Sequence, residues 1–537
     1  MIKIYEDMKN RLFILLILTV GISLMASAQG AYFYKRYAEK GDKEAMYNLA
    51  ICYMYGDEDV AQDFGQAIFW LNKAVKKKYA PAEVTLAYCY IYGIGVLKDY
   101  QKAWELCCEA AKQNNGAAFY YMSQMCKEGM YARQDNSLYY NYLVKAAGLG
   151  FAKAVTELAG IYMSGNENPY VTQDIERGLS LYKMAAEQND GEALLQLGLI
   201  YRDGIEGVVE PDPETGYQYI MAAAETGIPR ATFEYGYVTL YGMGCTRDYT
   251  TAYRFIYAAA EQGVPDAYGV MGGIYFYGYG VEVDAAEAAK WYQKAVDAEY
   301  VPAYTQLASM YIYGIGVTED ETKAFKLIKK SADTGYVLGY AWLGWCYRYG
   351  SGVDKNIELA ILNYKKAADS GDNYSCLLLY LLYRDGEGVD RDWAQSLRYL
   401  REAADAEIPE ALGYLGKEYM LGELLGKDKT KAIKYLTLSA DANCGYAAAV
   451  LGTLYYSGED LVERDYDKAF KYLSIAVNQK WEDEDEKLLA LVCRDLGACY
   501  RFGRGTSVDH SYASFYTEQA AKYGDNGSSN AMEIIRK

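Results

Sequence analysis

The stretch Ala82 to Ala111, AEVTLAYCYIYGIGVLKDYQKAWELCCEAA, decides the fold, because the same pattern returns along almost the whole chain. Thirteen copies can be aligned, and eight of the twelve spacings between them are 36 residues. A fixed period of this length is typical of a solenoid, in which each copy buries its apolar face only against its neighbours. The copies begin at Ala45, Ala82, Ala118, Ala154, Ala193, Ala231, Ala267, Ala303, Gly339, Ser375, Ala411, Ala447 and Val492.

Each copy predicts two helices, which we call helix A and helix B, joined by a short loop. In helix A, apolar residues recur at helical spacing, as at Ala303, Leu307 and Tyr311. A glycine follows helix A in every copy, and we expect it to be left-handed, a conformation that glycine adopts at low cost. Asp in twelve copies, and Asn356 in the other, then stands where the N-cap of helix B is expected. Helix B ends in small residues that let a neighbouring helix approach closely.

This pattern resembles the Sel1-like repeat, a relative of the tetratricopeptide repeat. The resemblance covers nearly the whole chain after its first residues, and it is specific because many positions recur in thirteen copies at once. It implies an all-α fold, a right-handed superhelical solenoid of antiparallel helix pairs. It also implies a scaffold or adaptor role, without naming a partner. In the copy quoted above, the matching positions are Ala82, Leu86, Ala87, Tyr90, Gly93, Gly95, Val96, Asp99, Ala103, Ala110 and Ala111.

The first 28 residues predict a signal peptide. Lys9 and Arg11 precede an apolar run from Leu12 to Met25, and Ala26-Ser27-Ala28 forms a small-x-small cleavage site. We therefore expect an exported protein, periplasmic or secreted. The apolar run is too short to span a bilayer comfortably and no later stretch is longer, so we expect no stable membrane insertion after cleavage.

The remaining chain divides by its repeats. Residues 29–44 predict an N-terminal half-repeat helix, residues 45–527 the thirteen repeats, and residues 528–537 a C-terminal capping segment. The copies at Ala45, Ala154 and Ala193 carry one, three and two extra residues in the loop from helix A to helix B. The largest irregularity is an insertion around 478–491, where Trp481 precedes an acidic run; it is a candidate hinge, partner site or subdomain boundary.

The charge of the chain limits its partners. Its 72 acidic and 54 basic residues give a net charge of −18, and removal of residues 1–28 takes away three basic and two acidic residues and changes this to −19. An acidic surface repels phosphate backbones and anionic lipid headgroups. We therefore expect no nucleic-acid binding and a protein or peptide partner that is basic rather than acidic.

The residues offer little for catalysis. His510, the only histidine, lies beside Asp509 in the last loop between helices, where we expect an exposed residue and an N-cap. Ser180 and Lys183 have the Ser-x-x-Lys spacing of penicillin-interacting enzymes, but they stand in the middle of a helix B without the accompanying motifs. The Gly-x-Gly turns lack the rest of a phosphate-binding loop. We predict neither an enzyme nor a metal or cofactor site.

The eleven cysteines are an odd number for an exported chain, so at least one thiol stays free or pairs between molecules. Four of them occupy one core position of helix A, where other copies carry Ile, Val, Leu or Met, and we interpret them as core residues. These four are Cys52, Cys89, Cys346 and Cys499. A disulfide between Cys107 or Cys108 and Cys126 stays open.

Tyrosines that stand immediately before the closing glycine of helix A are the best candidates for an interaction surface. They either pack the helix end against its loop or present a ladder of rings to a ligand, as rigid amphipathic side chains do at many interfaces. With Trp481, the candidate interaction residues are Tyr55, Tyr92, Tyr241, Tyr277, Tyr313, Tyr349 and Trp481.

The sequence thus favours a non-enzymatic scaffold or adaptor that binds a protein or peptide in the bacterial envelope or outside the cell. A second hypothesis is an envelope-glycan or β-lactam-interacting protein, which would be an enzyme if Ser180 were a nucleophile. A third is oligosaccharide binding by the tyrosine ladder without catalysis, for which Tyr277 and Tyr313 are the test positions.

Overall fold

The computed structural model describes residues 30–56, 59–131, 133–165, 171–458, 461–479 and 486–524. These residues form 27 helices and, apart from one isolated antiparallel bridge between Ile205 and Val209, no β-structure. The predicted all-α class is therefore confirmed. The predicted signal peptide, Trp481 and the predicted capping segment 528–537 all lie outside the described residues.

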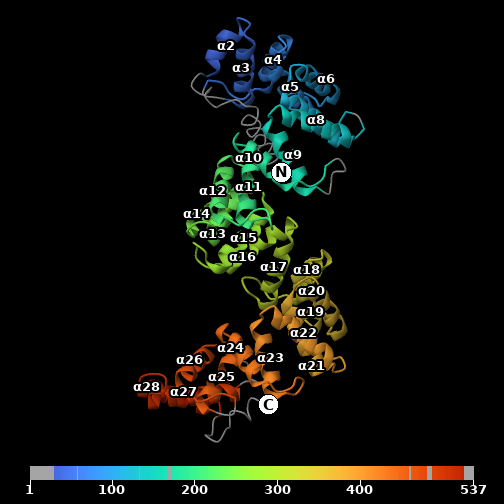
Figure 1. The fold of residues 1–537 in the computed structure, drawn as a ribbon. Coiled ribbons are helices and arrows are strands. Elements are labelled where there is room, and N and C mark those ends of the chain that lie inside the picture. The colour runs from blue at the N-terminus through green and yellow to red at the C-terminus, as the bar shows by residue number, and fades with distance from the viewer. Residues whose placement is uncertain are drawn as a thin grey trace. The chain divides into compact units, whose positions relative to one another are not determined.

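The chain divides into two compact units, which meet between Ala295 and Val296 within α16 (Figure 1). The helices that begin in the first unit are α2 (Ala31–Ala38), α3 (Lys43–Tyr55), α4 (Phe64–Lys76), α5 (Ala80–Tyr92), α6 (Tyr100–Ala111), α7 (Gly116–Glu128), α8 (Asn136–Gly148), α9 (Ala152–Ser164), α10 (Ile175–Ala186), α11 (Gly191–Asp203), α12 (Pro213–Glu225), α13 (Pro229–Tyr241), α14 (Tyr249–Glu261), α15 (Pro265–Tyr277) and α16 (Ala285–Asp297). The second unit contains α17 (Val301–Tyr313), α18 (Glu321–Asp333), α19 (Val337–Tyr349), α20 (Ile357–Asp369), α21 (Asn373–Asp385), α22 (Trp393–Asp405), α23 (Pro409–Leu421), α24 (Lys429–Asp441), α25 (Gly445–Ser457), α26 (Tyr466–Val477), α27 (Glu486–Phe502) and α28 (His510–Lys522).

From α3 onward the odd-numbered helices are A helices and the even-numbered ones are B helices. Within each unit a helix packs mainly against the helices that precede and follow it, and some successive A helices also touch, as α17 and α19 do. This nearest-neighbour packing of antiparallel pairs is that of a solenoid, as predicted. The right-handed superhelix stays a prediction.

The B helices begin where the sequence predicts. The Asp99 carboxylate accepts a hydrogen bond from the backbone N–H of Lys102 at 3.0 Å, and the Asn356 side chain accepts one from Leu359 at 2.9 Å. All thirteen B helices have such an N-cap. Each cap satisfies an otherwise unpaired amide and contributes about 1 kcal/mol to the stability of its helix.

The glycine after helix A has positive φ in every copy, but the predicted left-handed helical conformation is wrong for three of them. Gly56, Gly165 and Gly204 have ψ angles of 152°, −40° and 175°, whereas Gly93 has a ψ of 39°. These three glycines belong to the copies with extra residues in the following loop. The copy at Ala447 also has one extra residue in this loop, yet Gly458 keeps a ψ of 40°, so an extra loop residue does not always change this conformation.

Within a copy, a tyrosine three residues before this glycine stacks on the helix B of the same copy. The ring pairs are nearly parallel, with centroids 6.0 Å apart for Tyr383 and Tyr399 and 5.8 Å apart for Tyr419 and Tyr435. Large residues of helix B also fill the space above small residues of helix A, as Tyr364 does over Gly344. Offset ring stacking adds to the area that each pair buries.

Adjacent copies are joined by a second glycine in the loop after helix A. At Gly352, an added Cβ would lie 2.1 Å from the carbonyl oxygen of Glu321, at the start of the preceding copy's helix B. Gly244 and Gly505 have the same relation to Pro213 and Tyr466. The loop of one copy therefore rests directly on the first turn of the previous helix B, a contact that only glycine permits.

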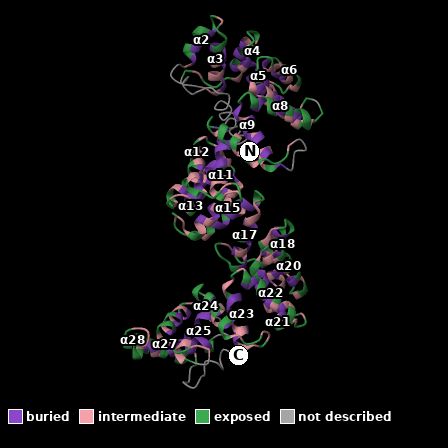
Figure 2. Cartoon of the chain, viewed as in Figure 1, coloured by how far each residue is buried: buried purple, intermediate pink, exposed green. Residues whose placement is uncertain are grey.

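The buried residues gather where neighbouring helices of a unit face each other (Figure 2). At the N-terminal end, α2 stands where the half-repeat helix is expected and buries Ala31, Tyr34 and Ala38. At the C-terminal end, α27 has 17 residues instead of the usual 13, so part of the insertion around 478–491 extends this helix by about one turn. Among the described helices, none has the length and apolar character needed to cross a bilayer.

Candidate interaction surface

The A helices have one face that is at least partly exposed in most copies, although some of its residues are buried, as Val450 and Thr453 are. We call it the A face and define it as the residues three, six and ten positions after the first residue of each copy, which helical periodicity places on one side. In α19 these are Trp342, Trp345 and Tyr349. The intervening Leu343 and Cys346 are buried instead. Exposure is greatest at the C-terminal end of the helix, because the chain turns away there.

The six predicted tyrosines all lie on this face, at the ends of their A helices. Tyr55 is half-buried, whereas the other five are exposed, from 42% of Tyr92 to 59% of Tyr277. Burial raises the pKa of Tyr55 and Tyr92 above the ordinary value of 10. The rings are thus partly exposed, and they also pack on neighbouring rings, as Tyr92 does on Tyr88 at 4.4 Å between centroids. Their role in binding stays a prediction.

In the first unit the rings form a cluster around the end of α15. Tyr277 and Tyr279 stack with centroids 5.5 Å apart, and Tyr249 stacks on Tyr279 at 5.3 Å. Tyr241 joins them: burial raises its pKa, and the neighbouring Tyr237, Tyr279 and Tyr277 raise it further. The predicted ladder is thus a local cluster, and Tyr313 and Tyr349 belong to the second unit.

In the second unit the sequence analysis missed two residues of the A face. Trp342 and Trp345 lie three residues apart on α19, and their ring centroids are 5.7 Å apart. The ring centroids of Trp345 and Tyr349 are 5.2 Å apart. All three are only partly covered or exposed. Their spacing of three and four residues is the signal that identifies them, but the same spacing marks core residues, and only the structure separates the two.

The A face carries more acidic than basic residues, but most of its charges are compensated locally. The Glu157 carboxylate accepts hydrogen bonds from Lys127 and Tyr139, both at 2.9 Å. Arg202 reaches Glu234 at 3.1 Å, and Arg384 pairs with its neighbour Asp385. Some of these ion pairs join adjacent copies, and others lie within one copy. Because its charges are paired in this way, the surface is characterised by its aromatic rings rather than by a charged groove. The acidic members are Glu128, Glu157, Asp203, Glu234, Asp385 and Asp495, and the basic one is Lys417.

The residues considered for catalysis are not gathered into a site. Ser180 and Lys183 are both exposed on α10, where water surrounds them and nothing prepares a nucleophile. His510 is exposed, as predicted, although it is the first residue of α28 rather than part of a loop. Asp509 caps this helix at 2.9 Å and 3.0 Å, as predicted. Among the described residues, no three His, Cys, Asp or Glu side chains converge as metal ligands would.

All eleven cysteines lie among the described residues, and all are free thiols there. Cys89, Cys346 and Cys499 are buried as the core interpretation predicts, while Cys52 is only partly buried. Burial raises the pKa of Cys89 and of Cys346 to about 12. A protonated, buried thiol is a poor nucleophile, so these cysteines act as apolar core residues.

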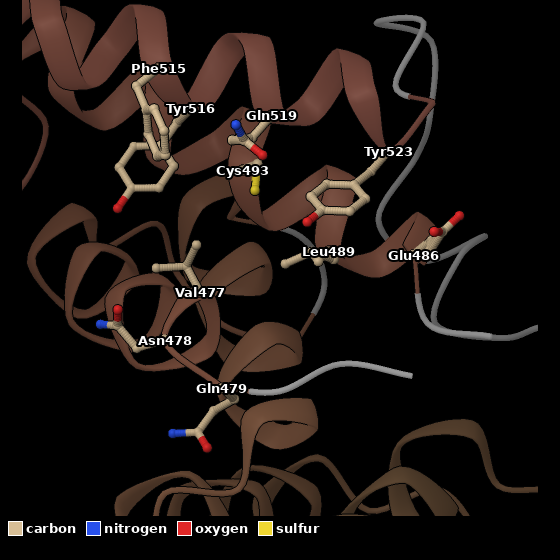
Figure 3. A pocket seen from close by; sticks show the side chains of 10 residues that line it. All are labelled: Val477, Asn478, Gln479, Glu486, Leu489, Cys493, Phe515, Tyr516, Gln519 and Tyr523. Carbon is tan, nitrogen blue, oxygen red and sulfur yellow. The ribbon is translucent and has the colours of Figure 1, made fainter. Parts of the chain in front are cut away.

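A cavity of about 510 Å³ lies at the C-terminal end of the second unit. In Figure 3, the Tyr516 ring of α28 and the ring of Tyr523, the residue after this helix, face the end of α26, and Leu489 and Cys493 of α27 lie between them. Burial raises the pKa of Cys493 to about 11, so its thiol is protonated. The cavity can hold an apolar group, but it offers no activated nucleophile. Residues 480–485, which join the end of α26 to α27, lie outside the described residues.

Comparison with protein families gives a match that runs along the whole array. The model for the Sel1 repeat matches thirteen segments, in agreement with the thirteen copies counted in the sequence. These segments are 43–79, 80–115, 112–130, 152–190, 191–227, 229–264, 265–300, 301–336, 337–372, 376–407, 409–444, 445–480 and 490–525.

Two curated fungal proteins are similar over part of their length. Chitin synthase regulator SKT5 of Saccharomyces cerevisiae is 29% identical over 39% of this chain and 31% of its own. Chitin synthase regulatory factor 3 of Schizosaccharomyces pombe is 26% identical over 37% of this chain and 22% of its own. The similarity thus spans less than a third of either relative.

Two solved structures are also similar to this chain. A Sel1 repeat protein from Oxalobacter formigenes is 29% identical with a TM-score of 0.42, over 47% of this chain and 99% of that one. A protective antigen present in uropathogenic Escherichia coli strains is 24% identical with a TM-score of 0.45, over 94% of this chain and 93% of that one.

Proposed function

The chain belongs to the Sel1 repeat family, and from this premise we propose that it is a non-catalytic scaffold that binds a protein or peptide on its A face. Sel1 repeats act in contacts between proteins, and the two fungal relatives are named as regulators of an enzyme. A regulator acts by binding rather than by its own chemistry. The observation that carries the proposal is the exposed rings at the ends of A helices within each unit, Tyr241 and Tyr277 in the first and Tyr313 and Tyr349 in the second.

The physical argument starts from the cost of leaving aromatic rings in water. Tyr277, Tyr313 and Tyr349 each expose more than half of their side-chain surface, although neighbouring residues of the same helices are fully buried. Tyrosine and tryptophan supply much of the binding energy at protein interfaces, since they bury a large area and lose little conformational entropy. Repetition of the rings in adjacent copies of one unit suits a partner that touches more than one copy at once.

We also propose that the protein works outside the cytoplasm, in the bacterial envelope or beyond it. The basis is the basic, apolar and small-residue order of residues 9–28, which is that of a signal peptide. Expression of the whole chain in a bacterial host, followed by N-terminal sequencing of the product, tests this. Export with Gln29 as the first residue supports the proposal, and retention of the uncleaved chain inside the cell contradicts it.

A comparison of three immobilised baits tests the scaffold role. The first is the chain itself, the second has Tyr277→Ser and Tyr349→Ser on the A face, and the third has Phe69→Ser and Trp393→Ser on B helices. All four side chains are exposed by at least 46%, so the two double variants are matched for the surface that they alter.

Proteins retained from the native envelope are then identified by mass spectrometry. We expect a partner that the chain and the B-helix variant retain and the A-face variant loses. Equal retention on all three baits contradicts binding by the A face. Turnover of an envelope substrate that is lost when one polar residue is replaced would contradict the non-catalytic role.

A further inference from the structure

The first described helix, α2, leaves two aromatic rings open to solvent. Ala31, Tyr34 and Ala38 form its buried side, which packs on the array. Phe33 and Tyr37 lie outside that side and are 38% and 43% exposed. Their ring centroids are 4.9 Å apart, so they contact each other. The outer side of α2 therefore begins with a pair of exposed rings.

Basic side chains stand beside these rings. Arg36 and Lys40, four residues apart and so on one side of the helical turn, are both exposed. Lys77, at the end of α4, has its ammonium group 3.9 Å from the position that a Cβ of Gly41 would occupy. It therefore lies beside the end of α2, and the preceding Lys76 is exposed as well.

The local charge is opposite in sign to that of the whole chain. Residues 31–44 and 64–78 together contain eight basic and three acidic residues, whereas the chain as a whole carries a net charge of −18. Within the described part of the chain, Arg36, Lys40 and Lys77 take part in no ion pair. Their charges are therefore available to an anionic partner.

The acidic residues of the following loop lie at the other end of these helices. The Asp59 carboxylate accepts a hydrogen bond from the backbone N–H of Tyr32, at the start of α2. Asp63 accepts one from Gln66, at the start of α4. The basic residues stand at the C-terminal ends instead, about 12 Å away along α2.

Exposed rings next to unpaired basic groups suit the headgroup layer of a membrane. Aromatic side chains of an amphipathic helix enter this layer, while Lys and Arg contact the phosphates of anionic lipids. At physiological ionic strength, exposed charges more than about 8 Å away are largely screened. The local basic residues, rather than the acidic remainder of the chain, therefore decide the contact.

The order of the sequence favours a membrane over a soluble polyanion. α2 begins at Ala31, six residues after the apolar run from Leu12 to Met25, which we interpret as part of a signal peptide. Six residues span at most about 20 Å. Export through a signal peptide would therefore deliver α2 directly beside the bilayer.

We propose that this end of the first unit binds the surface of an anionic membrane. The basic patch that does so consists of Phe33, Arg36, Tyr37, Lys40, Lys76 and Lys77. The inference rests on the proposed location outside the cytoplasm and adds that the protein is held reversibly at a membrane surface after cleavage. Because the patch lies on α2 and α4, the A face stays available to a protein partner.

Sedimentation with lipid vesicles tests the proposal. The chain from Gln29 to Lys537, the product expected after export, retains every described residue. It is mixed with vesicles of equal parts phosphatidylcholine and phosphatidylglycerol, and with vesicles of phosphatidylcholine alone. We expect binding to the anionic vesicles only, and release as the sodium chloride concentration rises.

Variants locate the patch. Arg36→Gln with Lys40→Gln should lower the partition coefficient about thirtyfold, because two attractions to the anionic surface are lost. Lys326→Gln with Lys329→Gln, at exposed positions of α18, is the matched control, since it changes the net charge equally. This control should bind as the parent does.

A second double variant tests the rings without changing the charge. Phe33→Ser with Tyr37→Ser should also lower the partition coefficient, because the rings no longer enter the headgroup layer. Thermal denaturation of every variant shows whether it is folded as the parent is.

The outcomes separate this inference from the function on which it rests. Absence of binding to the anionic vesicles, or equal losses for the α2 and α18 variants, overturns the basic patch but leaves export and the scaffold role standing. Binding to immobilised heparin without binding to vesicles would assign the patch to a soluble polyanion and overturn the proposal as well. Failure of export appears separately, as an uncleaved N-terminus.

Discussion

A residue that departs from the repeat pattern shows what the equivalent position requires in the other copies. Glu418 is the clearest case. It occupies the column in which twelve copies place Cys, Met, Ile, Val or Leu, and only 8% of it is exposed. The same copy has Leu424 where most copies have the second loop glycine, and the Leu424 backbone N–H donates a hydrogen bond to the Glu418 carboxylate. The two departures from the pattern are therefore coupled.

Burial raises the pKa of Glu418 above its ordinary value of 4.5; Glu423 raises it as well, while the Leu424 N–H, Lys417 and Arg384 lower it in part. The folded state therefore binds the proton more tightly than the unfolded state, and this residue costs stability as the pH rises from about 4.5 through its folded pKa. We predict that Glu418→Gln matches the parent near pH 4 and melts at a higher temperature at pH 7 to 8.

Thermal denaturation followed by circular dichroism from pH 4 to pH 8 measures this difference. Glu410→Gln, an exposed position on the same helix, is the control and should show no comparable rise with pH. A Glu418→Gln variant that is less stable than the parent at pH 7 would show that the ionised carboxylate stabilises the loop.

At the scale of the elements, the loop after helix A joins one copy to the previous one. An alanine at Gly352 would meet the Glu321 carbonyl at 2.1 Å and would also need a φ of +68°. Gly335, in the turn from helix B to helix A, has a φ of +85° but no atom within 4 Å of an added Cβ. Comparison of the two glycines therefore separates the cost of a close contact with the preceding helix from the cost of a positive φ.

We predict that Gly335→Ala destabilises the second unit by about 1–2 kcal/mol, the cost of a left-handed alanine. Gly352→Ala should cost clearly more, on the order of 3 kcal/mol, since the loop must also move off the preceding helix. Urea denaturation of the two variants measures the difference. Equal effects would mean that the loop does not bear on the stacking of copies.

The sequence predicts the helix boundaries well where a side chain acts on its own backbone. The Asp or Asn at the N-cap position caps every helix B, because the hydrogen bond joins residues only two or three positions apart. The turn from helix B to helix A was missed, since its left-handed position holds glycine in some copies, as at Gly335, but Asn, Lys or Glu in others, as at Asn189 and Glu299. No single residue type marks that turn.

The interaction surface is less predictable for a physical reason. The end of helix A is recognisable in the sequence, so Tyr277 and Tyr349 could be placed there, and both are exposed in the structure. Trp342 and Trp345 were not, because core and surface residues share helical spacing and only the packing of the neighbouring copies decides which face is covered. The cavity beside Cys493 depends on the extra turn of α27, which no other copy contains.

For the whole molecule, nearest-neighbour stacking predicts tolerance to the loss of a complete copy. Deletion of residues 409–444, which contain α23 and α24, rejoins equivalent surfaces of α22 and α25. We predict that this variant keeps its mean residue ellipticity and a cooperative melting transition.

Deletion of residues 409–426 alone is the matched control, since it removes one helix of the pair and brings two B helices together. This shorter deletion should lose helix and melt broadly. If both deletions behave alike, the copy is not the unit of stability.

The central claim is that the A face of this array binds a protein partner, and site-specific photo-crosslinking tests it most directly. The photoreactive residue p-benzoylphenylalanine replaces Tyr277 or Tyr349 on the A face, and Phe69 or Trp393 on B helices, in the cell that makes the protein. We predict that irradiation yields an adduct with one partner protein from an A-face position and none from the B-helix positions. Adducts only from Phe69 or Trp393, with the folded A-face variants unreacted, would contradict the account.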